Sequence, residues 1–160
     1  MMQSYYDREM AKPMWQELAD IGVKPLTSGP EVDQFMSSSK GTVLIVVNSV
    51  CGCSASNARP GVALALQNKV IPDNLATVFA GVDREATAKA REYIVGYPPS
   101  SPSVALFRDG KLVFMLERHS IEGSAAEEVA AELTASFNEH CTRSGPSVPE
   151  EQLKKAFGIA

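Results

Sequence analysis

The chain has 160 residues, of which 44% are hydrophobic and 21% charged, and its formal net charge is −4. This length suits one domain that buries a core without disulfide staples. The mildly acidic balance gives no electrostatic footprint for nucleic acid or an anionic membrane, so we expect neither as a partner. No basic start precedes an apolar run, and the longest apolar stretch, Val43–Val47, is far below the ~20 residues of a membrane helix. We therefore expect a cytoplasmic protein.

The pattern of elements predicts an α/β fold with a central mixed β-sheet flanked by helices and an N-terminal helical extension. The extension is an amphipathic helix with apolar residues at three- and four-residue spacing: Tyr6, Met10, Met14, Leu18 and Ile21. Strands are predicted at 42–47, 76–82, 103–108 and 112–116, and helices at 53–70, 83–94 and from Ser124 onward. Asp109-Gly110 predicts a hairpin between the last two strands.

The chemistry concentrates where the buried strand 42–47 ends, because Val50-Cys51-Gly52-Cys53-Ser54 follows it directly. Unpaired N–H groups at a helix N-terminus favour a thiolate, the form that attacks disulfides. Cys51 precedes the expected helix, so we predict that it is the exposed nucleophile. Cys53 lies deeper and is the candidate resolving thiol. Gly52 allows unusual backbone angles between them and is a candidate substrate-binding residue.

A second element supports this site. Ser100-Ser101-Pro102 immediately precedes the strand 103–108. In redox proteins of this architecture, a proline at this place lies across from the cysteine loop and exposes backbone polar groups to an extended substrate. We predict that the Ser101–Pro102 bond is cis, since only X–Pro bonds adopt that form at small cost. Ser101 and Pro102 are therefore candidate substrate-binding residues.

Residues 79–110 resemble the second half of a thioredoxin, and a wider set of motifs resembles the bacilliredoxin family. These motifs are Val46–Ser54 (VVNSVCGCS), Ala58–Pro60 (ARP), Asp83–Lys89 (DREATAK), Pro99–Ser103 (PSSPS), Arg118-His119, Ile121–Gly123 (IEG) and His140-Cys141. The resemblance covers about residues 4–141. We expect residues 1–141 to form the thioredoxin-like bacilliredoxin domain. Residues 142–160 are a C-terminal tail without a counterpart in the family pattern, and they could form a short helix.

The resemblance implies a Cys-Gly-Cys thiol–disulfide oxidoreductase that removes bacillithiol from mixed disulfides on cytoplasmic proteins, with weak disulfide isomerase activity. By position, Cys51 would take the bacillithiol group and Cys53 would resolve it. Bacillithiol, or a similar small thiol, would be a co-substrate, and no metal, nucleotide or flavin cofactor is expected. The expected partners are S-thiolated proteins, and the chain would be a monomer or a weak homodimer.

Two other functions fit the cysteine pair. Cys51 and Cys53 could hold a soft metal ion in a binding or delivery module, and with His140 and Cys141 they make a donor set suited to zinc. The pair could also belong to a non-enzymatic redox sensor whose oxidation changes an interface. We expect Cys141 to be a surface thiol, Arg59 to have a structural or solvent-facing role, and Asp83 to cap a helix.

Overall fold

The computed structural model describes residues 3–158. A five-stranded sheet has the order β1-β4-β2-β5-β6, and its strands are β1 (Lys24–Pro25), β2 (Thr42–Asn48), β4 (Asn74–Phe79), β5 (Ser103–Arg108) and β6 (Lys111–Leu116). β1, β4 and β2 run parallel, whereas β5 is antiparallel to both β2 and β6. This mixed sheet confirms the α/β fold with a thioredoxin-like arrangement.

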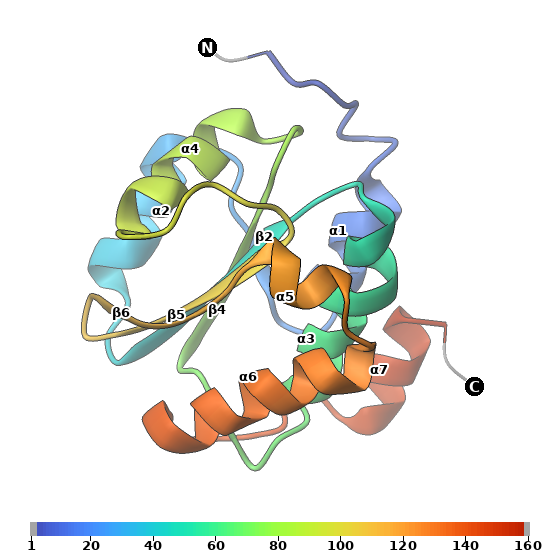
Figure 1. Ribbon diagram of the computed structural model, residues 1–160, viewed down its shortest axis with the longest axis vertical. Helices are drawn as coiled ribbons and strands as arrows, with labels where there is room; N and C mark the ends of the chain where they lie inside the picture. The colour runs from blue at the N-terminus through green and yellow to red at the C-terminus, as the bar shows by residue number, and fades with distance from the viewer. Residues whose placement is uncertain (1–2, 159–160) are drawn as a thin grey trace.

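Helices cover both faces of the sheet (Figure 1). α2 (Gly29–Ser38) and α4 (Arg84–Tyr93) pack side by side on one face, and α3 (Arg59–Ala65) and α6 (Ala126–His140) pack together on the other. β2 is buried along its whole length. Alternate residues of β2 enter two cores: Val43, Ile45 and Val47 face α2 and α4, and Leu44 and Val46 face the other layer.

The N-terminal helix is shorter than its apolar spacing predicts. α1 spans Lys12–Ala19, with Pro13 in its first turn, where a proline's missing N–H is harmless. Leu18 and Ile21 are buried as expected. Tyr6 and Met10 are 50% and 79% exposed, so the prediction that they belong to the buried stripe is wrong.

Local signals set most of the other boundaries. Ser28 caps α2 by accepting from the N–H of Glu31 at 3.2 Å. Asp109 and Gly110 both have positive φ, +51° and +81°, which matches the predicted hairpin turn. The helix predicted from Ser124 onward is α6, which begins at Ala126, so the N-cap position is occupied by Ala125 and not by Ser124. The Glu128 carboxylate accepts from the N–H of Ala125 at 2.8 Å.

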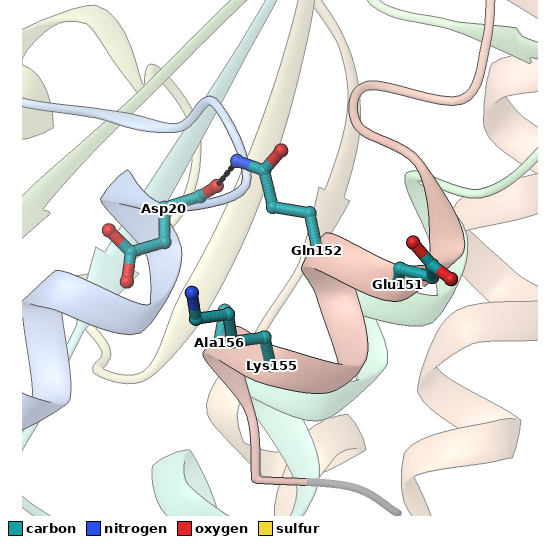
Figure 2. Close-up of a pocket in the computed structure, with 5 residues that line it drawn as sticks. All are labelled: Asp20, Glu151, Gln152, Lys155 and Ala156. Atoms are coloured by element: carbon teal, nitrogen blue, oxygen red, sulfur yellow. Dashed lines mark hydrogen bonds between the residues drawn. The ribbon is translucent and has the colours of Figure 1, made fainter.

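The C-terminal residues are packed onto the same core. β7 (Arg143–Ser144) pairs with β3 (Val70–Ile71), where the sequence predicts the end of a helix. α7 (Glu150–Ala156) follows, in the segment for which a short helix was one expectation. Its Leu153 is 5% exposed and belongs to the core under α3 and α6. Gln152 ties α7 to the end of α1 by donating to the carbonyl of Asp20 at 2.7 Å (Figure 2).

Candidate active site at the end of β2

Cys51 and Cys53 are joined by a disulfide, directly after β2 and at the start of the helical segment that leads into α3. The carbonyl of Cys51 accepts from the N–H of Ser54 at 3.0 Å, so the chain turns into a helix at this residue. The N–H of Cys53 points at the sulfur of Cys51, with 3.3 Å between nitrogen and sulfur. Both cysteines are only partly buried, so substrate can reach the pair.

Gly52 lies between the cysteines and is exposed. The expectation of unusual backbone angles is wrong, since Gly52 lies in a helical turn and is not among the glycines with positive φ. A Cβ added at this position would meet nothing within 4 Å. The structure thus leaves open space beside Gly52.

The helix after Cys53 begins with a π-helical turn, Ser54–Ala58, before α3. The N–H of Arg59 accordingly bonds to the carbonyl of Ser54, five residues back. Pro60, in the first turn of α3, has no N–H to donate to the helical ladder, which is irregular at this point. Arg59 follows this turn directly and points inward, with 5% of its surface exposed.

Arg59 is the main member of the site that sequence reasoning undervalued. Its Nη1 donates to the Asn48 side-chain oxygen at 3.1 Å, to the carbonyl of Ser49 at 3.3 Å and to the Ser54 hydroxyl at 3.2 Å, and its Nε pairs with the Glu17 carboxylate. The Ser49 hydroxyl in turn accepts from the N–H of Cys51 at 3.1 Å. A buried guanidinium therefore holds the loop that carries Cys51. In the sequence, the Ala58-Arg59-Pro60 motif shared with the family was the one indication that Arg59 belongs to the site.

Pro102 lies at the same edge of the sheet as the cysteines. Val47 of β2 pairs with Ser103 of β5 in antiparallel register, which places the residue before Ser103 next to the end of β2. The Ser101–Pro102 bond is cis, as predicted. The carbonyl of Ser101 accepts from Nη1 of Arg118 at 3.1 Å, so α5 (Arg118–Glu122) holds this segment in place.

The remaining candidate residues lie apart from this site. Cys141 is 6% exposed, so the expectation of a surface thiol is wrong, and burial raises the pKa of its thiol. Among residues 3–158, no group of three or more His, Cys, Asp or Glu side chains could hold a metal ion, so the zinc set with His140 and Cys141 is not assembled. Asp83 makes no side-chain cap, and its carboxylate pairs with Arg8 instead.

A hollow of about 620 Å³ lies elsewhere on the protein and is not part of this site. It lies between α1 and α7, and Figure 2 shows Asp20, Glu151 and Lys155 among its lining residues. This mixed-charge lining contains no cysteine and no residue of the Ser101–Pro102 segment. As a separate finding, none of the helices within residues 3–158 is both long and apolar enough to span a membrane.

A cysteine pair at a strand–helix junction, beside a cis-proline in a thioredoxin-like sheet, defines a thiol–disulfide oxidoreductase. Residues 6–141 match the family model described as disulphide isomerase. The chain is 48% identical over 136 residues to bacilliredoxin BH1716 of Halalkalibacterium halodurans, covering 85% of this chain and 94% of that one. It is 50% identical over 134 residues to a bacilliredoxin of Cytophaga hutchinsonii, covering 84% and 98%. The chain belongs to the bacilliredoxin family.

One relative also bears on the C-terminal tail. A bacilliredoxin of Salinibacter ruber is 48% identical over 164 residues and covers 95% of this chain and 96% of its own, so the match extends into residues 142–160. The family model ends at residue 141, whereas this relative has a counterpart of at least part of the tail. Among solved structures, a thioredoxin of Malassezia sympodialis is 16% identical with a TM-score of 0.48, covering 74% of this chain and 90% of that one.

Proposed function

We propose that this protein removes a low-molecular-weight thiol, bacillithiol or a similar one, from mixed disulfides on cytoplasmic proteins. The observation that carries the proposal is the N–H of Cys53 directed at the sulfur of Cys51 at the start of a helix. The same N–H would donate to a Cys51 thiolate once the pair is reduced, which favours the attacking form. Partly buried sulfurs beside the open space at Gly52 leave room for a substrate disulfide.

The first step transfers the small thiol to the protein. The Cys51 thiolate attacks the sulfur of the small thiol, the bond between that sulfur and the substrate cysteine breaks, and the substrate leaves as a thiolate. Cys51 then carries the small thiol in a mixed disulfide. The partly exposed Ser101, next to the buried Pro102, would align an extended substrate chain beside the cysteines.

The second step releases the small thiol. The Cys53 thiolate attacks the sulfur of Cys51, the small thiol leaves as a thiolate, and the Cys51–Cys53 disulfide forms. Two electrons from a reducing thiol then restore the pair. Alternatively, a second small thiol attacks the adduct, so that Cys51 is released and a small-thiol disulfide forms. Neither route requires a metal or an organic cofactor, and a monomer or weak homodimer suffices.

The test is a release assay on a model protein carrying bacillithiol in a mixed disulfide, with wild type, Cys51→Ala and Cys53→Ala. We expect release by wild type, none by Cys51→Ala, and retained release by Cys53→Ala when excess small thiol is present. Inactivity of wild type toward this donor, together with isomerisation of protein disulfides, would replace the bacillithiol assignment by an isomerase. A disulfide that only opens and closes, with no turnover, would indicate a sensor.

A further inference from the structure

A small hollow of about 150 Å³ lies beside the segment that ends in Pro102. Its lining joins the end of α4, the loop that follows it and the two outer strands: Arg91, Ile94, Tyr97, Pro98, Pro99, Ser100, Ser103 and Met115. A hollow of this volume is below the range of whole-ligand pockets, so it suits a single chemical group of a larger molecule. The proposed mechanism uses no residue of the hollow's lining.

Arg91 is the unusual member of this lining. Its Nε is buried and has no hydrogen-bond partner in the described part of the chain. Burial lowers the pKa of its guanidinium, yet an arginine in a protein stays protonated. A buried donor on a cation without a partner costs free energy, so a protein gains nothing in stability from keeping it. Such an unpaired donor is the kind of group that an anionic ligand satisfies.

The charges around the hollow also favour an anion. No acidic residue is part of its lining, in a chain whose net charge is −4. A second guanidinium, that of Arg118, is bonded to Ser101, the residue next to the lining serine Ser100. Arg118 shares its charge with Glu122 through a bond of 3.1 Å, whereas the Nε of Arg91 remains unpaired.

The hollow and the cysteines lie at the same edge of the sheet, where β2 ends and β5 begins. Ser103 lines the hollow and pairs with Val47 of β2, and Cys51 follows four residues after Val47. The segment Ser100–Ser103, which contains Pro102, therefore lies between the cysteine loop and the hollow, and a small thiol bound at Cys51 would extend along it toward Arg91.

The geometry points to this hollow as the binding site for a carboxylate of the small thiol that Cys51 accepts, with Arg91 as its cationic partner. The inference rests on the proposed function and deepens it by naming the residue that would select small thiols with a carboxylate. Arg91 would be a specificity-determining residue, because a guanidinium binds a carboxylate through two parallel hydrogen bonds and offers none of this to a neutral thiol.

Kinetics test the substrate class. Two mixed disulfides of one model protein serve as donors, one with 3-mercaptopropionate and one with neutral 2-mercaptoethanol. We expect wild type to prefer the anionic donor, and Arg91→Gln to lower the ratio of the two kcat/KM values by about tenfold, the effect of losing a hydrogen bond to a charged group. Arg84→Gln is the matched control, since it removes the same charge from the same helix, where Arg84 stacks on Tyr5. An unchanged ratio in Arg91→Gln, or an equal fall in Arg84→Gln, would overturn the inference.

A binding measurement separates this site from the exchange reaction. Oxidised protein labelled with ¹⁵N is titrated with succinate and with neutral succinamide. Succinate should shift the amide signals of Ser100, Ser103 and Met115, succinamide should not, and Arg91→Gln should abolish the shifts while keeping a folded spectrum. Absence of these shifts in wild type refutes the subsite even where thiol exchange is intact. Their presence in a protein that exchanges no mixed disulfide would retain the carboxylate site and reject the proposed function.

Discussion

The backbone nitrogen of Cys53 lies 3.3 Å from the sulfur of Cys51 and donates to it. This contact makes the two cysteines chemically different, because among residues 3–158 the Cys51 sulfur receives a backbone N–H and the Cys53 sulfur receives none. The N–H groups of Ser54 and Ala55 donate to the carbonyl of Cys51 and start the helix at this residue, so Cys51 sits at the positive end of the helical turn.

The first prediction concerns the relative reactivity of the two thiols. In reduced protein at pH 7, Cys51 should be alkylated at least about tenfold faster than Cys53, since thiolate nucleophilicity follows stabilisation of the anion. A short iodoacetamide pulse followed by peptide mass spectrometry measures both rates in one sample. Equal rates, or faster modification of Cys53, would show that the donated hydrogen bond does not select the nucleophile.

The second prediction concerns Arg59, whose removal would leave the carbonyl of Ser49 and the carboxylate of Glu17 without their guanidinium partner. Arg59→Met should lower the free energy of unfolding by about 3 kcal/mol, because the buried acceptors on Asn48, Ser49 and Ser54 lose their donor. Urea unfolding measures the loss. The variant should also slow release of the small thiol, as the Cys51 loop loses its anchor.

Glu17→Gln is the matched control for Arg59. It keeps an oxygen that can accept from Nε of Arg59, and its side chain is 22% exposed, so the expected loss is below about 1 kcal/mol. A loss as large as that of Arg59→Met would mean that the ion pair itself, rather than the bonds to Asn48, Ser49 and Ser54, holds the loop.

The third prediction uses Cys141, whose thiol has a pKa raised first by burial and further by the nearby charge of Asp73, against a lowering bond with Thr42. Above about pH 8.5 the unfolded chain loses this proton while the native state keeps it, so the contribution of Cys141 to stability falls as pH rises. In oxidised protein, the stability advantage of wild type over Cys141→Ala should therefore shrink between pH 7 and pH 10. An advantage that grows with pH would contradict the buried neutral thiol.

The fourth prediction tests whether the C-terminal helix is part of the fold. Leu153 is buried in the main core, so Leu153→Ala should cost about 3 kcal/mol in urea unfolding. Lys154→Ala removes a half-exposed neighbour on the same helix and should change stability by less than about 0.5 kcal/mol. Equal effects of the two substitutions would show that α7 contributes nothing to the core.

Most of the sheet could be predicted from sequence because β2 is apolar on both faces and Asp109-Gly110 specifies its own turn. The cysteine pair at the end of β2 followed from that strand and from local helix signals. The start of α1 could not be predicted from apolar spacing. Tyr6 and Met10 fit the helical period, yet they precede the helix, which begins at Lys12.

The residues beneath the site were less accessible to sequence reasoning. In the sequence Arg59 has the pattern of an ordinary helical cation, whereas in the structure it follows a π-helical turn and donates to Asn48. Arg91 likewise sits in the last turn of an ordinary amphipathic helix, and its unpaired Nε is visible only once the loop after α4 is in place. Both depend on tertiary contacts between segments far apart in sequence.

The most direct test of the central claim is intact-mass analysis of Cys53→Ser after incubation with a protein carrying a bacillithiol mixed disulfide. The substitution removes the resolving thiol, so the first intermediate should accumulate. We predict a single adduct with the mass of the small thiol, located by peptide mapping on Cys51 and removed by reductant. An adduct on Cys141, or no adduct while the substrate stays thiolated, would contradict the assignment of Cys51 as the group that takes the small thiol.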